Sequence, residues 1–306
     1  MRQKLRVGTR GSFLARRQTA WVTAKIKEQH PHLDIEQVLI STRGDLTTEP
    51  LPRVGEKGLF TRELERALVN EEIDFAVHSL KDLPVELLPG LTIGAVPRRA
   101  NPLDALVTRE ISDLTRLPWG ARVGTSSLRR AAQLRYLRPD IIVMDLRGNL
   151  DTRLRKLERG FVDALILAAA GLERIGWEAQ NIISITPEIC LPAPGQGALA
   201  VEIREDDQYM KEICLNSLED TSTRQAVTAE RAFLNALGGG CQIPVGALAL
   251  VQEDCLWLRG IVLQQDGKRM LRGEIRGIPE EPFSVGNALA QSLLEKGAHE
   301  ILAGGL

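Results

Sequence analysis

The sequence predicts an α/β protein with two similar halves and a smaller α+β domain at its carboxyl end. A strand, a glycine-containing loop, a helix and a second strand occur twice in the same order. After about residue 220 the pattern changes to a helix followed by alternating stretches. The 306 residues are 43% hydrophobic and 26% charged, which suits two or three globular domains and excludes disordered and collagen-like classes.

The first half alternates strands and helices. In order, the pattern predicts strand 5–7, a helix with apolar residues between 14 and 26, strand 35–42, a helix with apolar residues from 60 to 68, and strand 74–78. Ser12 stands where an N-cap is expected, after the loop that contains Gly8 and Gly11. The last strand runs into Ser79-Leu80-Lys81-Asp82.

The second half repeats this order, which indicates an internal duplication. Its elements are strand and loop 123–127, helix 128–137, strand 141–146, a helix opened by residues 152–154, and strand 163–167. Two such halves bind ligands at loops that follow the carboxyl ends of their strands. We therefore expect the repeated glycine-containing loops to carry the functional residues.

The carboxyl-terminal part has different elements. We expect helix 223–237, strands 245–251 and 256–263, a hairpin turn at Asp266-Gly267 and one final helix over 285–302. The predicted domains are 1–98 with 198–217, then 103–193, then 220–306.

A short segment before residue 198 resembles a nucleotide-binding fingerprint. Gly195, Gly197 and Ala200 match G-x-G-x-x-A, but prolines precede the match and a strand pattern follows it. We interpret the segment as a crossing between domains and keep a nucleotide-dependent oxidoreductase as a distant alternative.

Positive charge is concentrated in the second half. The whole chain has a net charge of −1, yet residues 116–160 contain ten arginines and one lysine against four acidic residues. Guanidinium groups bind carboxylates in two-point contacts, and helix N-termini favour anions. Arginines at the loop-to-helix junctions therefore predict a polyanionic ligand, whereas Arg116, Arg135, Arg138, Arg155 and Arg159 are interpreted as solvated or paired. With 4% aromatic residues and no stacking pattern, no nucleic acid is expected.

Metal, disulfide and membrane classes find no support in the sequence. Four cysteines show no C-x-x-C spacing and four histidines no H-E-x-x-H arrangement, so we expect no metal and reduced thiols. The longest apolar run, 164–172, is too short to span a bilayer, and no signal-peptide core begins the chain. We expect a cytoplasmic monomer.

Four motifs together resemble the porphobilinogen deaminase family, also called hydroxymethylbilane synthases. They are residues 123–130 (VGTSSLRR), 146–149 (LRGN), 78–84 (HSLKDLP) and 239–244 (GGCQIP). The resemblance covers essentially the whole chain. It implies three domains, the first two folded as type II periplasmic-binding-protein-like α/β domains with mixed sheets, and the third a small α+β domain.

The resemblance implies a transferase of tetrapyrrole and heme biosynthesis. The family joins four porphobilinogen molecules head to tail, releases ammonia at each step, and frees hydroxymethylbilane by hydrolysis. It uses one dipyrromethane cofactor per chain, held by a thioether that the resemblance assigns to Cys241. Cys190, Cys214 and Cys255 keep a structural interpretation.

Asp82 is the catalytic residue that the resemblance implies, since a fixed carboxylate stabilises cationic pyrroles and helps to move protons. Further cofactor-binding residues by similarity are Lys81, Asp82, Thr125, Ser126, Ser127, Arg129, Arg130 and Gly148. Substrate-binding residues by similarity are Arg10, Ser12, Lys57, Phe60, Ser79, Arg147, Arg153 and Arg174. Three of these residues keep an alternative interpretation. Lys81 is alternatively solvated, and Asp82 is alternatively a turn residue ahead of Pro84. Phe60 either stacks on a pyrrole or, from its helical spacing with Leu64, is a core residue. The sequence departs from the family pattern at Gly11, Phe13 and Arg53.

A second hypothesis from another class is a non-catalytic anion-binding protein. Such a protein needs arginines but has no use for a tethering thiol or for a buried catalytic carboxylate.

Overall fold

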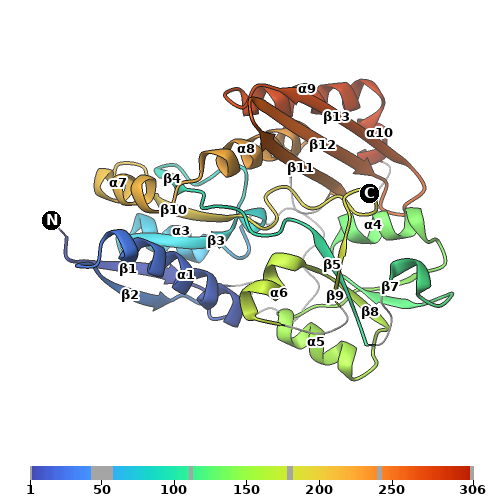
Figure 1. Cartoon of the computed structure of the whole chain (residues 1–306), viewed down its shortest axis with the longest axis horizontal. Helices are drawn as coiled ribbons and strands as arrows, with labels where there is room; N and C mark the ends of the chain where they lie inside the picture. Colours follow the sequence, from blue (N-terminus) through green and yellow to red (C-terminus); the bar gives the residue numbers. More distant parts are fainter. Residues whose placement is uncertain (1, 43–57, 110–112, 178–181, 240–242, 304–306) are drawn as a thin grey trace. The chain divides into compact units, whose positions relative to one another are not determined.

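The computed structural model describes residues 2–42, 58–109, 113–177, 182–239 and 243–303. They form two compact units (Figure 1). Unit 1 consists of Met1–Arg99 and Ala198–Arg224, and unit 2 consists of Ala100–Gly197 and Gln225–Leu306. The chain therefore crosses between the units three times: it leaves unit 1 after Arg99, returns at Ala198 and leaves again after Arg224.

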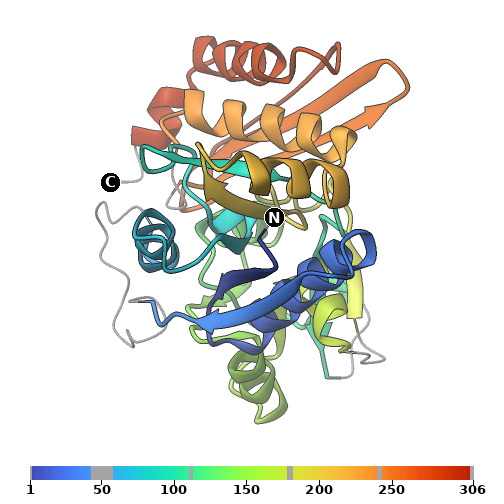
Figure 2. The same ribbon diagram turned by 90° about the vertical axis from the view of Figure 1, so that its left-hand side faces the viewer.

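Unit 1 is a five-stranded mixed sheet covered on both faces. Its strands are β1 (Lys4–Thr9), β2 (Asp34–Leu39), β3 (Phe75–Ser79), β4 (Leu91–Ala95) and β10 (Leu199–Arg204), in the order β2-β1-β3-β10-β4. One apolar cluster packs α1 (Phe13–Gln29) and α7 (Gln208–Ser217) on one face. A second cluster packs α3 (Arg62–Val69) on the other face, as Figure 2 also shows.

Unit 2 contains a second five-stranded mixed sheet. Its strands are β5 (Asp104–Thr108), β6 (Arg122–Gly124), β7 (Ile142–Met144), β8 (Ala164–Ala168) and β9 (Ile182–Ile185), in the order β7-β6-β8-β5-β9. Helix α4 (Leu128–Leu137) packs on one face, and α5 (Leu150–Glu158) and α6 (Ala169–Ile175) pack on the other.

The two sheets share one topology. In each sheet three parallel strands are followed by an antiparallel strand, β10 or β5, that the chain adds just after crossing between the units. The shared topology confirms the predicted repeat of elements in the two halves. This is the type II periplasmic-binding-protein-like arrangement that the resemblance implied.

The carboxyl-terminal part of unit 2 is an antiparallel sheet of β11 (Val245–Gln252), β12 (Cys255–Leu263) and β13 (Met270–Gly277). One face packs against α8 (Thr221–Ala236), α9 (Pro282–Glu295) and α10 (Ala298–Ala303). Ala132 of α4 and Leu191 pack with Leu248 and Ile261 of this sheet. The prediction of one final helix was wrong: Gly297, at φ +92°, separates α9 from α10.

The segment with the fingerprint-like glycines contains turns and leads directly into β10. A dinucleotide fingerprint requires a helix at that point. The oxidoreductase alternative therefore has no structural support.

Candidate active site

The Lys81-Asp82 motif lies in a short 3₁₀ turn, η1 (Leu80–Asp82), directly after β3. Leu80 is 1% exposed, and its N–H donates to the carbonyl of Ala198 at 3.0 Å. Burying Leu80 leaves Lys81 half-buried and Asp82 exposed. The expectation of a buried carboxylate was therefore wrong for Asp82, because the turn directs Leu80, and not Asp82, into the core.

Polar contacts on two sides hold the end of β3. Nε2 of Gln18 in α1 donates to Oγ of Ser79 at 2.9 Å. The buried Nε2 of His78 lies 3.0 Å from Oε2 of Glu202 in β10. Both contacts act just before the turn, so the backbone that presents Asp82 is anchored to α1 and to β10.

The buried carboxyl of Glu65 lies near this anchor. Burial, and then the negative charge of Glu202, raise the pKa of Glu65 above its ordinary value. The face of β3 that carries His78 thus holds two acidic side chains away from water.

Arg10, Ser12 and Phe60 lie in unit 1. The guanidinium carbon of Arg10 is 4.3 Å from the ring centroid of Phe60, which is a cation–π contact. Ser12 is confirmed as the N-cap of α1, where its hydroxyl accepts from the N–H of Ala15 at 3.3 Å. At Gly11, one of the departures from the family pattern, an added Cβ would meet nothing within 4 Å, so a larger side chain has room there.

In unit 2 the loop after β6 is organised by its own hydroxyl groups. Oγ1 of Thr125 accepts from the N–H of Ser127 at 3.1 Å, and Oγ of Ser127 caps α4. The exposed Ser126 donates from Oγ to the carbonyl of Leu146 at 2.6 Å. The loop therefore holds a fixed shape at the amino end of α4.

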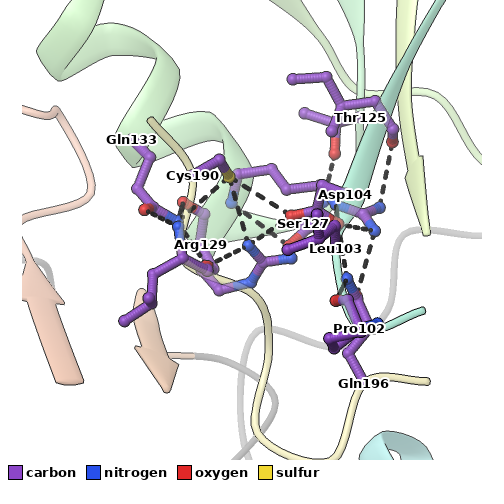
Figure 3. A network of polar contacts seen from close by, with 12 residues as sticks. Pro102, Leu103, Asp104, Thr125, Ser127, Arg129, Gln133, Cys190 and Gln196 are labelled. Carbon is purple, nitrogen blue, oxygen red and sulfur yellow. Dashed lines mark hydrogen bonds and ion pairs between the residues drawn. The ribbon is translucent and has the colours of Figure 1, made fainter. Parts of the chain in front are cut away.

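Arg129 and Arg130 are buried and share the carboxylate of Asp104. Figure 3 shows Arg129 and Asp104 in this network of polar contacts. Nη1 of Arg129 lies 2.7 Å from Oδ2 of Asp104. Nε and Nη2 of Arg130 lie 2.9 and 2.7 Å from Oδ1. Burial alone would raise the pKa of Asp104, but the two guanidinium groups outweigh it and hold that pKa far below its usual range.

The network of Asp104, Arg129 and Arg130 carries more positive than negative charge. With Asp104 ionised, two cations and one anion give it a net charge of +1. Nε of Arg129 is buried and has no hydrogen-bond partner among the described residues. The network therefore retains positive charge and one unused donor even after Asp104 is counted.

Arg147, Gly148 and Arg153 lie around the loop before α5. Nε of Arg147 is 3.3 Å from Oδ2 of Asp145, and Nε of Arg153 donates to the carbonyl of Gly148 at 3.0 Å. Gly148 has φ +114°, a conformation that favours glycine. Both arginines remain half exposed, unlike Arg129 and Arg130.

Arg174, at the end of α6, donates from Nη2 to the carbonyl of Gly197 at 2.7 Å. Burial lowers the pKa of its guanidinium to about 10. Arg174 therefore contacts the segment through which the chain returns to unit 1.

Three residues named in the sequence analysis, Cys241, Lys57 and Arg53, lie outside the described residues. Cys190, Cys214 and Cys255 are free thiols. Burial raises the pKa of Cys190 and of Cys214 to about 12, so neither is a nucleophile at neutral pH. Their structural interpretation is consistent with this environment.

Sequence reasoning missed Asp104, Gln196 and Glu202. Asp104 is an acidic residue that opens an apolar strand, and Glu202 lies inside another. An acidic residue within a buried strand needs a partner, and that was the available signal. The partner itself has no local signal.

Asp104→Asn is expected to lower the free energy of unfolding by about 3–5 kcal/mol at pH 7, because two buried guanidinium groups lose their counter-ion. The folded-state pKa of Asp104 lies below its unfolded value, so its contribution is complete above that unfolded value, about 3.9, and declines at lower pH. Urea unfolding from pH 7 to pH 3 should therefore show a difference between the two proteins that is constant down to about pH 4 and begins to narrow below it. Asp266→Asn, in an exposed turn, is the control, and a constant difference across this range would contradict the assignment.

The fold and these side chains define an α/β protein whose loops present hydroxyl and guanidinium groups suited to an acidic small molecule. Among the described residues no group of three histidine, cysteine or acidic side chains is placed to hold a metal ion. Within the same residues, no helix has the length and apolar character needed to cross a membrane.

Comparison with known proteins shows the family. "Porphobilinogen deaminase, dipyromethane cofactor binding domain" matches residues 5–212, and "Porphobilinogen deaminase, C-terminal domain" matches residues 224–295. The porphobilinogen deaminase of Roseiflexus sp. (strain RS-1) is 52% identical over 99% of this chain and 100% of its own length. That of Brevibacillus brevis is 49% identical over 98% and 97%. The chain belongs to the porphobilinogen deaminase family.

Solved structures of binding proteins resemble the chain only weakly. The probable amino-acid ABC transporter extracellular-binding protein ytmK of Bacillus subtilis covers 71% of this chain with 90% of its own, at 14% identity and a TM-score of 0.45. The methionine-binding protein MetQ covers 70% of this chain with 89% of its own, at 14% identity and a TM-score of 0.43.

Proposed function

We propose that the chain is a hydroxymethylbilane synthase, a transferase of tetrapyrrole biosynthesis. It joins four porphobilinogen molecules head to tail with release of ammonia, and hydrolysis then frees the linear tetrapyrrole. The observation that carries the proposal is 52% identity to a porphobilinogen deaminase over nearly the whole of both chains. The exposed Asp82 on an anchored turn and the basic loops of unit 2 suit this chemistry.

A covalent dipyrromethane cofactor fits the residues that are present. Its acetate and propionate groups need donors, and the described part of the chain offers the hydroxyls of 125–127, two arginines with a net positive network, and the unused Nε of Arg129. When bound, the cofactor supplies the pyrrole carbon to which the first substrate unit is joined. We assign its thioether to Cys241, with Lys81, Asp82, Thr125, Ser126, Ser127, Arg129, Arg130 and Gly148 as its binding residues.

We assign Asp82 the central catalytic role. Loss of ammonia from porphobilinogen leaves a cationic methylene-pyrrole, and a carboxylate held beside the pyrrole nitrogen stabilises that charge. The same oxygens accept and return a proton as the new carbon–carbon bond forms and the pyrrole regains its aromaticity. The contacts of Ser79 and His78 hold the turn, so the carboxylate needs little reorganisation.

The remaining residues bind substrate carboxylates in this proposal. Arg130, Arg147 and Arg153 are our first choices for chain elongation by similarity. Of these, Arg147 and Arg153 have half-exposed guanidinium groups that are accessible to a ligand, whereas Arg130 is buried. The full set is Arg10, Ser12, Lys57, Phe60, Ser79, Arg147, Arg153 and Arg174. Phe60 is assigned a stacking contact with a pyrrole ring and not with a carboxylate; its own ring lies against the guanidinium of Arg10.

Three further assignments belong to the proposal. We divide the chain into domains 1–98 with 198–217, 103–193 and 220–306, which the separate apolar clusters of the two larger sheets and of β11–β13 support. We propose that the protein acts as a monomer and in the cytoplasm.

Stoichiometry tests the function. Incubated with porphobilinogen, the purified chain should release four ammonia molecules for each hydroxymethylbilane formed, with the tetrapyrrole detected as porphyrin after cyclisation and oxidation. A non-catalytic anion-binding protein would bind porphobilinogen and release no ammonia. Binding without release of ammonia would contradict the proposed function and would favour the anion-binding protein.

A further inference from the structure

The first two of the three segments through which the chain crosses between the units are bonded to each other. The N–H of Ala100 donates to the carbonyl of Gly197 at 3.2 Å, and Nε2 of Gln196 donates to the carbonyl of Pro102 at 2.9 Å. Gly197 has φ +87°, and an added Cβ would lie 2.6 Å from the carbonyl oxygen of Ala100. The crossing segments, residues 98–103 and 195–199, therefore meet at backbone contact distance.

Gln196 also joins this contact to the arginine network (Figure 3). Its Nε2 donates to Oδ1 of Asp104 at 2.8 Å, the oxygen that receives both N–H groups from Arg130. Nη2 of Arg130 lies 3.4 Å from Oε1 of Gln196. One buried glutamine thus bonds to the carboxylate, to an arginine and to the opposite crossing segment.

We propose that Asp104 and Gln196 are positioning residues. They couple carboxylate binding at Arg129 and Arg130 to how rigidly the two crossing segments are held together. An incoming carboxylate draws on the same guanidinium N–H groups that now bind Asp104 and Gln196. The bonds from Gln196 to Asp104 and Pro102 therefore change in strength when a ligand binds. Such coupling is reciprocal, so the crossing segments also modulate the affinity of the arginines. The inference rests on the proposed function for the identity of the ligand.

Hydrogen–deuterium exchange on the cofactor-loaded full chain tests the contact. Gln196→Met removes both amide donors at similar volume, and we expect amide exchange in the crossing segments to rise about tenfold. Gln133→Met is the matched control, since Gln133 is equally buried in the same network but bonds to Leu191 and Cys190. Equal exchange of the crossing segments in the two variants would overturn the proposal.

The response to ligand separates coupling from mere support of the fold. In the unaltered protein, saturating porphobilinogen should change exchange in the crossing segments, and Gln196→Met should lose that response while its KM for porphobilinogen changes less than its kcat. If Gln196 only supported the fold, exchange without ligand would be faster in the variant, but porphobilinogen would still change it as in the unaltered protein. A preserved response in Gln196→Met therefore contradicts the coupling.

A pH series on Gln196→Glu adds an independent readout. An ionised carboxylate has no donor for Asp104 or Pro102, whereas a protonated one regains a single O–H donor. Protection of the crossing segments, measured against the unaltered protein at each pH, should therefore recover in acid for Gln196→Glu and not for Gln196→Met. The charged and titratable neighbours are Asp104, Arg130, Arg174 and the buried Glu230, which accepts from the N–H of Gly195, with Arg129 and Cys190 beyond them. Identical pH behaviour of the two variants would contradict the role of the donor.

These readouts distinguish the inference from the proposed function. If the chain makes hydroxymethylbilane but exchange in Gln196→Met is unaltered, only the coupling fails. If no tetrapyrrole forms, the proposed function fails while the exchange measurements still report on the contact.

Discussion

Cys241→Ser is expected to remove the cofactor and to abolish hydroxymethylbilane formation. Intact mass spectrometry of the unaltered protein should show the polypeptide plus two porphobilinogen units less two ammonia molecules. In the variant the mass should equal that of the bare polypeptide, because a serine hydroxyl is a much weaker nucleophile than a cysteine thiolate. Activity should fall by at least about three orders of magnitude, to the limit of detection.

Cys255→Ser is the matched control for this experiment. Cys255 is a described free thiol in β12, at the start of a strand and remote from the glycine-rich motif in sequence. It should keep the added mass and the activity. An added mass that survives in Cys241→Ser and disappears in another cysteine variant would move the attachment site, and full activity of a protein of bare mass would disprove covalent priming.

Asp82→Asn is expected to lower kcat by about 10²–10⁴-fold while porphobilinogen still binds. The change removes the negative charge and the proton acceptor but retains the size of the side chain. Since Asp82 is exposed and its turn is held by Leu80, Ser79 and His78, the fold should not depend on the carboxylate. Single-turnover ammonia release and equilibrium binding separate the chemical step from affinity.

Glu86→Gln provides the control for charge alone. Glu86 is an exposed acidic residue four positions further along the same loop region, and its substitution should leave kcat within about twofold. If Asp82→Asn turned over at a near-normal rate, or if both variants lost activity equally, the catalytic role of Asp82 would have to be abandoned.

Local signals predicted the elements that depend on near neighbours. Helix α4 begins and ends where predicted, because Ser127 caps it and apolar residues recur at helical spacing. The duplicated order was also visible, since strands and helices follow one another within each half. The prediction of a single helix over 285–302 was wrong because Gly297 adopts φ +92°, a left-handed conformation that ends a helix.

The arginine-rich loops show where sequence reasoning stops. It placed Arg129 and Arg130 correctly at a loop-to-helix junction, and it expected both to serve a ligand. Asp104, their carboxylate partner in the fold, lies 25 and 26 positions earlier in the chain. No periodicity or cap signal extends over such a separation.

The sequence by itself determined the fold class, the two similar halves, the family and a short set of candidate site residues. These properties depend on local spacing and on motifs of a few residues. Only the tertiary structure decided that Asp82 is exposed, that Arg129 and Arg130 share Asp104, and that Gln196 joins them to the crossing segments. Those facts depend on which distant strands become neighbours, because buried charges find their partners through the packing of the whole sheet.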